Sequence, residues 1–430
     1  MSVTLEYPEM PGQTADREEL SSRAAAEAYV GGVCFKLGPP ALIGAELEWL
    51  TVKGGSSANS TDAPRPTLDD LAGALGPHAP RSLDPASPEL ALPGGSRVTV
   101  EPGGQIELSS STYPDAQALC AALRADAAVL RALLGTRGIR TVPLAADASR
   151  PPQRLLELPR YRAMERHFAG IGPFGTLMMC NTAAGQVSVD AGADAAEVAA
   201  RWHLLHAAGP ALLAAFACSP RLRGAPGGEW ASQRMRTWLR LDHSRARPPA
   251  EHWADPIAGY ATWALDVPLL CVRPCAQEPG AVQWTAPPGA TFADWLSGAL
   301  DDEIGRRPDR ADLDYHLTTL FPPVRASGYL EVRYLDAQPG DTWSTPVHAI
   351  EALLSAPEVV AEATALAAPT TGRWQEAAHA GLADGELRAA AEALLRLAAA
   401  HSAQQAELES AAERCRAGRT PHDDATEVQP

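Results

Sequence analysis

Polar residues recur at every second position in four short segments of the chain, and most of them are carboxylates or amides. Side chains on a β-strand point alternately to the two faces of a sheet, so residues two apart share a face. Apolar side chains take one face of the segments 42–50, 105–110, 185–190 and 329–335. The opposite face carries Glu46, Glu48, Gln105, Glu107, Ser109, Gln186, Ser188, Asp190, Glu331 and Arg333.

These side chains would form a surface for cations and phosphates if the four strands are neighbours. A half-solvated sheet also alternates polar and apolar residues, so one such strand alone indicates no function. At least four carboxylates on one surface would repel one another and raise each other's pKa, and a divalent cation would relieve that repulsion. Oxygen ligands suit Mg²⁺ or Mn²⁺, and magnesium held by carboxylates keeps positions open for phosphate oxygens. Arg333, beside Glu331, would add a planar fork for phosphate.

The elements that must position this surface are a mixture of helices and strands in irregular order. Strands are predicted at 42–52, at 98–110 around a Pro-Gly-Gly turn, at 175–190 as a pair, at 265–273 and at 328–337. Helices are predicted at 18–30, 67–75, 114–137, 161–169, 194–217 and 291–304, and in Ala-rich segments to about 418. Strands and helices do not alternate regularly, which predicts an α+β fold with an antiparallel or mixed sheet.

The composition excludes some partners and some kinds of site. The net charge of −16 argues against nucleic acid, whose phosphates would be repelled. Lys36 and Lys53 are the only lysines, and neither is followed by Ser or Thr as a P-loop requires. A nucleotide would therefore be held by arginine, backbone and metal.

The cysteines and the N-terminus favour a reducing compartment. The seven cysteines are odd in number and scattered, so a disulfide framework is not expected. The segment MSVTLEYPEM is no signal peptide, and no run of about 18 apolar residues occurs. We expect a soluble, cytoplasmic protein without a membrane partner, as a monomer or small homo-oligomer.

Six longer stretches, which include the four strands, carry a family resemblance. Together and in this order they resemble the glutamate–cysteine ligases of the carboxylate–amine ligase superfamily, which includes glutamine synthetase. More narrowly, they resemble the actinobacterial branch that supplies γ-glutamylcysteine for ergothioneine. The stretches are GAELEWL (44–50), EPGGQIELSS (101–110), MMCNTAAGQVSVDAG (178–192), RMRTWLRLDHSR (234–245), HLTTLFPPVR (316–325) and GYLEVRYLDAQP (328–339).

The resemblance implies a glutamine synthetase-like catalytic domain. Its sheet would be curved and mainly antiparallel, with helices packed on the convex side. One catalytic domain would span residues 18–419, with core motifs at 44–339 and Ala-rich helices at about 345–419. Residues 1–17 would be a flexible N-terminus and residues 420–430 a disordered tail.

The resemblance also implies roles for individual residues. Gln105 and Gln186 would line the substrate pocket, and Arg325 and Arg333 would contact ATP phosphate. Arg234 and Arg245 would bind the glutamate α-carboxylate or the phosphoryl group, and Arg234 and Arg333 would be catalytic. Metal ligands would be Glu46, Glu48, Glu101, Glu107 and Glu331.

The implied reaction needs no protein nucleophile. ATP would phosphorylate the γ-carboxylate of L-glutamate, and the amine of L-cysteine would attack the acyl phosphate to give γ-glutamylcysteine, ADP and phosphate. A related ligase for another amine or acid, and a non-catalytic regulator that binds nucleotide or metal, remain alternatives. Trp238 is interpreted as a core residue, and Asp336 as a residue that orients Arg333 or caps a turn.

Overall fold

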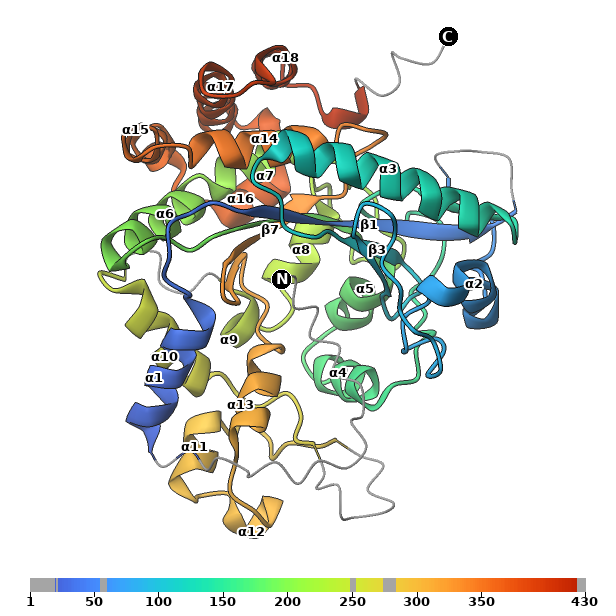
Figure 1. The fold of residues 1–430 in the computed structure, drawn as a ribbon, viewed down its shortest axis with the longest axis vertical. Coiled ribbons are helices and arrows are strands. Elements are labelled where there is room, and N and C mark those ends of the chain that lie inside the picture. The colour runs from blue at the N-terminus through green and yellow to red at the C-terminus, as the bar shows by residue number, and fades with distance from the viewer. Residues whose placement is uncertain (1–19, 21, 55–59, 248–252, 274–283, 424–430) are drawn as a thin grey trace.

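The described part of the chain contains one antiparallel sheet of seven strands (Figure 1). The strand order is β2-β3-β1-β5-β7-β6, and β4 pairs with β1. The computed structural model describes residues 20, 22–54, 60–247, 253–273 and 284–423. The strands are β1 (Ile43–Lys53), β2 (Arg97–Val100), β3 (Ile106–Ser109), β4 (Ile139–Val142), β5 (Ala184–Val189), β6 (Val324–Ala326) and β7 (Leu330–Asp336). Every pairing is antiparallel, so the prediction of an α+β fold with a mainly antiparallel sheet is confirmed.

The apolar face of the sheet is covered by a layer of helices, which lie above the strands in Figure 1. Leu47, Val187 and Val332 point into this layer and are buried. The helices contact one another closely because their facing surfaces are rich in alanine and leucine. They are α3 (Ala116–Gly135), α6 (Ala195–Ala207), α7 (Gly209–Phe216), α14 (Ser344–Leu353), α15 (Pro357–Ala367), α16 (Trp374–Ala380), α17 (Gly385–Ala400) and α18 (Gln405–Arg416).

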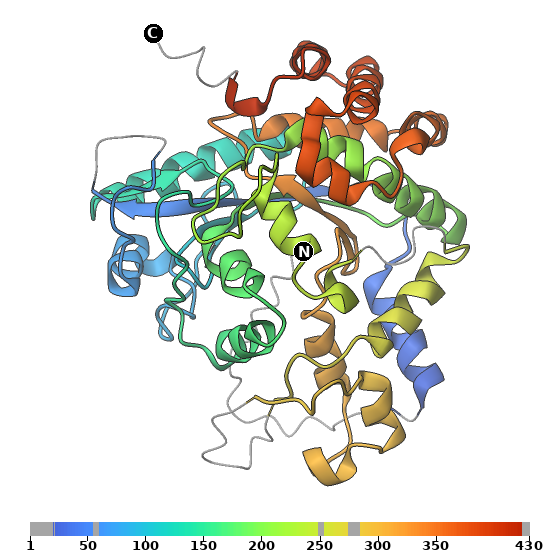
Figure 2. The ribbon, with the colours of Figure 1, turned by 180° about the vertical axis from the view of Figure 1, so that it is seen from behind.

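Shorter helices flank the opposite face of the sheet (Figures 1 and 2). They are α1 (Arg23–Cys34), α2 (Leu68–Leu75), α4 (Pro159–Ala169), α5 (Phe174–Asn181), α8 (Gln233–Leu239), α9 (His243–Ala246), α10 (Pro256–Asp266), α11 (Phe292–Ser297), α12 (Asp301–Ile304) and α13 (Arg310–Leu317). Among the described residues, no helix combines the length and apolar character needed to cross a bilayer.

Several predicted elements differ from the structure. The first half of 175–190 is helix α5, because a short apolar run has no period that separates helix from strand. The predicted helix 194–217 is broken at Gly209-Pro210, because proline cannot donate a helical hydrogen bond. Residues 267–273 form no strand; α10 ends at Asp266, and only Pro268 makes an isolated bridge.

The remaining differences concern short elements and the ends of the chain. Sequence reasoning missed β4 and β6, which are four and three residues long. Residues 421–423 form a helical turn, so the prediction of a disordered tail from residue 420 is wrong there. Residues 424–430 and the predicted flexible segment 1–17 lie outside the described residues.

Candidate active site

The strand registers bring the predicted polar residues side by side. On β1, Glu46 lies opposite Ser109 of β3 and Gln186 of β5, and Glu48 lies opposite Glu107. On β7, Glu331 lies opposite Ser188 of β5 and Arg325 of β6. The strands are therefore neighbours, which meets the condition set for a shared polar surface. We call the surface they share the polar face; it comprises Glu46, Glu48, Glu107, Ser109, Gln186, Ser188, Arg325, Glu331 and Arg333.

Glu48 and Glu107, two carboxylates of the polar face, crowd together with Glu101 from the turn before β3. Glu107 is buried and accepts hydrogen bonds from Thr99 Oγ1 at 2.5 Å and Ser109 Oγ at 3.1 Å. Burial and the charges of Glu101 and Glu48 raise the pKa of Glu107 well above its ordinary value. Burial and the charge of Glu101 likewise raise the pKa of Glu48 to about 8.

Glu46 extends this group of like charges toward the other edge of the sheet. Its carboxylate accepts a hydrogen bond from Gln186 Nε2 at 2.7 Å. Burial raises the pKa of Glu46, and the charges of Glu107 and Glu331 raise it further. The structure therefore places four interacting carboxylates on one surface, as the strand alternation predicted.

Among the described residues, Glu331 is the carboxylate of the polar face that forms ion pairs with arginine. Its side chain is fully buried and contacts Arg325 Nη2 at 3.2 Å and Arg333 Nη1 at 2.6 Å. Burial opposes ionisation, but the two guanidinium groups prevail and lower the pKa of Glu331 below its ordinary value. Glu331 is thus an anion that gathers two arginines at this end of the polar face.

The chemistry of the polar face fits a divalent cation. Within the described ranges, no three His, Cys, Asp or Glu side chains stand as a ready-made metal cage. The available donors are all oxygen, however, and Glu46, Glu48 and Glu107 form no ion pair with any described residue. The buried Oε1 atoms of Gln105 and Gln186 also have no hydrogen-bond partner, which is costly unless a ligand supplies one.

The turn before β3 holds Glu101 and Gln105 against helix α5. Gln105 Nε2 donates to the carbonyl oxygen of Thr182 at 2.9 Å, and Glu101 N donates to Gln105 O at 2.9 Å. A Cβ on Gly103 would lie only 2.3 Å from the carbonyl oxygen of Cys180, so only glycine permits this approach. The Pro-Gly-Gly turn therefore brings Glu101 to the same end of the sheet as Glu48 and Glu107.

Arg333 and Arg234 lie together beside Glu331. Arg234 is buried, and its Nη2 donates to the backbone carbonyl of Arg333 at 2.8 Å. Both guanidinium groups face the indole ring of Trp238. The buried Nε of Arg333 has no hydrogen-bond partner, which leaves a donor for an anionic ligand.

Arg245 and Asp336 have contacts that differ from those expected. Arg245 is fully buried, and its guanidinium donates to Asp242 Oδ2 at 2.8 Å, Thr319 O at 3.1 Å and Pro268 O at 2.6 Å. These contacts favour a structural role, and its substrate-binding role stays a prediction. Asp336 accepts from Cys218 N, Ser219 Oγ and Ser232 Oγ rather than from Arg333, so the interpretation that it orients Arg333 is wrong.

A second group of cations was missed by sequence reasoning. The Cζ atoms of Arg160 and Arg273 lie 5.2 and 4.7 Å from the ring centroid of Tyr315. Neither arginine forms an ion pair with a described carboxylate, and Arg160 is held by Thr318 Oγ1 and O. Uncompensated cations in a chain of net charge −16 are suited to an anionic ligand. The three residues lie far apart in the sequence, so no spacing could have linked them.

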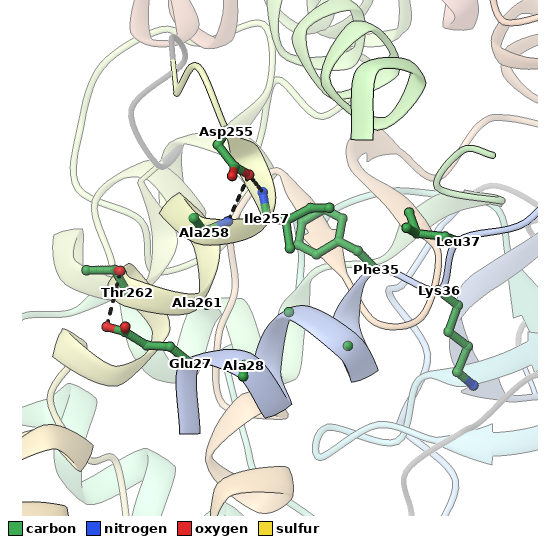
Figure 3. Close-up of a pocket in the computed structure, with 12 residues that line it drawn as sticks. Glu27, Ala28, Phe35, Lys36, Leu37, Asp255, Ile257, Ala258, Ala261 and Thr262 are labelled. Atoms are coloured by element: carbon green, nitrogen blue, oxygen red, sulfur yellow. Dashed lines mark hydrogen bonds between the residues drawn. The ribbon is translucent and has the colours of Figure 1, made fainter. Parts of the chain in front are cut away.

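A separate cavity of about 600 Å³ lies between α1 and α10 (Figure 3). Its carboxylates are already engaged in structural contacts. Glu27 accepts from Thr262 Oγ1 at 3.2 Å, and Asp255 caps α10 through Ile257 N and Ala258 N at 3.0 Å each (Figure 3). This cavity therefore offers no carboxylate comparable with those of the polar face, and the polar face is the candidate active site.

Comparison with known proteins finds relatives of similar fold and similar sequence. A solved glutamate–cysteine ligase from Francisella tularensis, in complex with AMP, has a similar fold, with a TM-score of 0.50 at 13% identity, over 91% of this chain and 85% of that one. The chain is 40% identical over 384 residues to the glutamate–cysteine ligase EgtA of Mycolicibacterium smegmatis, covering 89% of this chain and 85% of that protein.

The EgtA of Mycobacterium tuberculosis is 37% identical over 402 residues, covering 93% of this chain and 88% of that protein. The family model for glutamate–cysteine ligase family 2 (GCS2) matches residues 42–429, which include every strand of the polar face. With its carboxylate-lined antiparallel sheet and this match along nearly the whole sequence, the chain belongs to glutamate–cysteine ligase family 2.

Proposed function

We propose that this protein is an ATP-dependent ligase that joins the γ-carboxylate of L-glutamate to the amine of L-cysteine, giving γ-glutamylcysteine for ergothioneine biosynthesis. The observation that carries the proposal is the polar face, where crowded carboxylates border the partly buried Arg325 and Arg333. A carboxylate is a poor acylating agent, so the reaction requires activation by phosphoryl transfer, and this surface offers charges of both signs for it.

The described residues have distinct tasks in this proposal. Glu46, Glu48, Glu101 and Glu107, with Glu331 at the edge, would hold magnesium, which when bound neutralises phosphate charge. Arg333, with Arg325 beside Glu331, would contact the phosphate oxygens, and the arginines would remain fixed because Glu331 is shared between them. Gln105 and Gln186 would offer their unpartnered Oε1 atoms to substrate donors. Positioning and electrostatics would then supply the catalysis.

The arginine pair around Tyr315 is suited to a carboxylate of a substrate. Tyr315 and Phe321 belong to one apolar cluster, and the ring of Phe321 lies 5.7 Å from the ring of Trp238. This cluster connects Arg160 and Arg273 to the arginine end of the polar face. Arg160 would therefore anchor an amino-acid substrate whose reacting group is at that face, and Arg234 would serve the same substrate or the phosphoryl group.

The setting of the reaction forms part of the proposal. We propose one catalytic domain over residues 18–419, because the Ala-rich helices of the second half pack on the same sheet. A reducing, cytoplasmic location agrees with the six described cysteines, which are buried and form no disulfide with one another. A monomer or small homo-oligomer without nucleic acid agrees with the acidic charge.

The decisive experiment measures phosphate release from ATP with L-glutamate, with and without each of a panel of amines. Release that requires L-cysteine, with γ-glutamylcysteine as product, is the expected result. Release with another amine or acid would favour the related-ligase alternative, and ATP binding without turnover would favour the regulator. Glutamate labelled with heavy oxygen in its γ-carboxylate should transfer one label to phosphate for each bond made, and unlabelled phosphate would exclude activation of that carboxylate.

A further inference from the structure

The indole of Trp238 lies against two guanidinium groups that ought to repel each other. The Cζ atom of Arg333 is 5.4 Å from the ring centroid, and the Cζ atom of Arg234 is 5.8 Å from it. A cation over the face of an indole is attracted by the negative charge of the ring face, most strongly where water is excluded. Trp238 is thus the one side chain that contacts both arginines through its ring among the described residues.

The carboxylates nearby balance these two cations only in part. Glu331 pairs with Arg333 at 2.6 Å, but it also serves Arg325. Asp336 is 3.9 Å from Arg234, beyond a hydrogen bond, and is itself held by Ser219 and Ser232. Burial lowers the pKa of Arg234, and the charge of Arg333 lowers it further, although Asp336 and Glu48 oppose this. The ring face of Trp238 therefore adds an attraction for the two guanidinium groups that the nearby carboxylates do not fully provide.

Trp238 is itself fixed by packing and not by hydrogen bonding. It lies in the last turn of α8, which begins at the Ser232 cap and carries Arg234 in its first turn. The ring of Phe321 meets it edge-on at 5.7 Å, and its buried Nε1 has no hydrogen-bond partner. The face of the ring, and not its N–H group, is therefore what its neighbours use.

A stacked guanidinium keeps its N–H groups in the plane of the fork and free to bind an anion. Arg333 donates from Nη1 to Glu331, while its buried Nε has no hydrogen-bond partner among the described residues. We propose that Trp238 is a positioning residue for phosphoryl transfer, which holds Arg333 and Arg234 as one pair aimed at the oxygens of the transferred phosphoryl group. This inference rests on the proposed ligase function and adds a residue that sequence reasoning had assigned to the core.

The first test compares Trp238→Phe with Trp238→Leu. Phenylalanine keeps an aromatic face, whereas leucine keeps only bulk. We expect kcat of the Leu variant to fall by about tenfold to a hundredfold, the range for one to two lost cation–π contacts. The KM values for ATP and glutamate should stay within about twofold, because the contact acts on the transferring group. The Phe variant should retain kcat within about threefold of wild type.

Trp343 provides the matched control. It is buried, and its ring also lies under an arginine, with the Cζ atom of Arg124 at 5.3 Å from the centroid. Trp343→Leu should lower the melting temperature as the Trp238 variant does, yet leave kcat unchanged. Unchanged kcat in Trp238→Leu, or a Phe variant as impaired as the Leu variant, would overturn the proposal.

Fluorinated tryptophan gives a second test that does not depend on the Leu variant folding. Fluorine weakens the negative ring face with little change of shape, so log kcat should fall steadily with the number of fluorine atoms. The same series in the Trp238→Phe background, where the other nine tryptophans are still replaced, should show no such slope. Equal slopes in both backgrounds would refute the role of Trp238. A wild-type protein that makes no γ-glutamylcysteine would instead refute the proposed function.

Discussion

Replacing Glu107 or Glu331 by glutamine removes the same charge from the same face, yet the structure predicts opposite effects on stability. Glu107 lies among like charges, with Glu48 directly across the strand pair and Glu101 nearby. Glu331 lies between Arg325 and Arg333. In the metal-free protein, Glu107→Gln should therefore stabilise the fold, and Glu331→Gln should destabilise it. Both variants should lose turnover.

The size of each effect follows from these surroundings. Directly opposed residues in an antiparallel pair have Cβ atoms about 5 Å apart, and two unit charges at that separation repel by roughly 3 kcal/mol at an effective dielectric constant of 20. Proton uptake limits that cost, so we expect Glu107→Gln to raise the free energy of unfolding by about 1 kcal/mol. Removing one partner of a buried ion pair costs about 3–5 kcal/mol. Because Arg325 is 21% exposed, we expect the lower end for Glu331→Gln.

The assay is denaturant unfolding at pH 7.5 with a chelator, together with ligase turnover at limiting magnesium. The exposed Glu303 gives a control variant, Glu303→Gln, which should change stability by less than about 0.5 kcal/mol. Stability changes of the same sign in both test variants would refute the charge arrangement described above. Near-normal turnover in both would refute the assignment of these carboxylates to metal.

Three further predictions concern the arginines and the pH dependence. Arg333→Lys keeps the charge but loses the planar fork, so kcat/KM should fall at least about tenfold, which is a loss of about 1.4 kcal/mol of transition-state stabilisation. A wild-type rate in this variant would show that Arg333 is only a structural partner of Glu331. Since the folded state raises the pKa of Glu46, Glu48 and Glu107, their contribution to metal-free stability should be full below about pH 4.5 and should fall as the pH rises toward the pKa of Glu48, which is about 8. Magnesium should reduce that fall, and an unfolding midpoint that does not change over this pH range would contradict the prediction. Arg245→Gln should lower stability by about 3 kcal/mol with KM for glutamate unchanged, whereas a raised KM in a fully stable variant would restore its predicted substrate role.

The alternation of residue types was enough to predict which side chains share a face. It could not predict that β5 separates β1 from β7, because strand order depends on contacts between segments far apart in the chain. The residues of α5 were assigned to a strand because LMMC (177–180) is apolar throughout and has no period. The local pattern therefore indicated which polar side chains share a face of the sheet, whereas the arrangement of the strands and of α5 depended on tertiary packing.

The arginines show the same limit more sharply. Arg234 and Arg245 belong to one motif and were expected to share a task, but only Arg234 reaches the polar face. The guanidinium group of Arg245 donates its hydrogen bonds to Asp242 and to two backbone carbonyls. Arg160 carries no signal in its own segment, because its partners, Tyr315 and Thr318, come from α13 and the turn that follows it. The sequence shows which residues are cationic, but it does not show which guanidinium groups still have N–H donors available for a ligand.

A site whose side chains lie on strands, and not on loops, is sensitive to the insertion or deletion of residues. The side-chain period of a strand is two, so one inserted residue before Glu46 would turn both glutamates of β1 toward the helices and bring Leu47 to the reactive side. The same holds for β3, β5 and β7, each of which contributes at least one polar group through its register. Single-residue insertions or deletions within these strands should therefore abolish the enzyme where many substitutions do not, and any natural variation in length should fall in the connections between them.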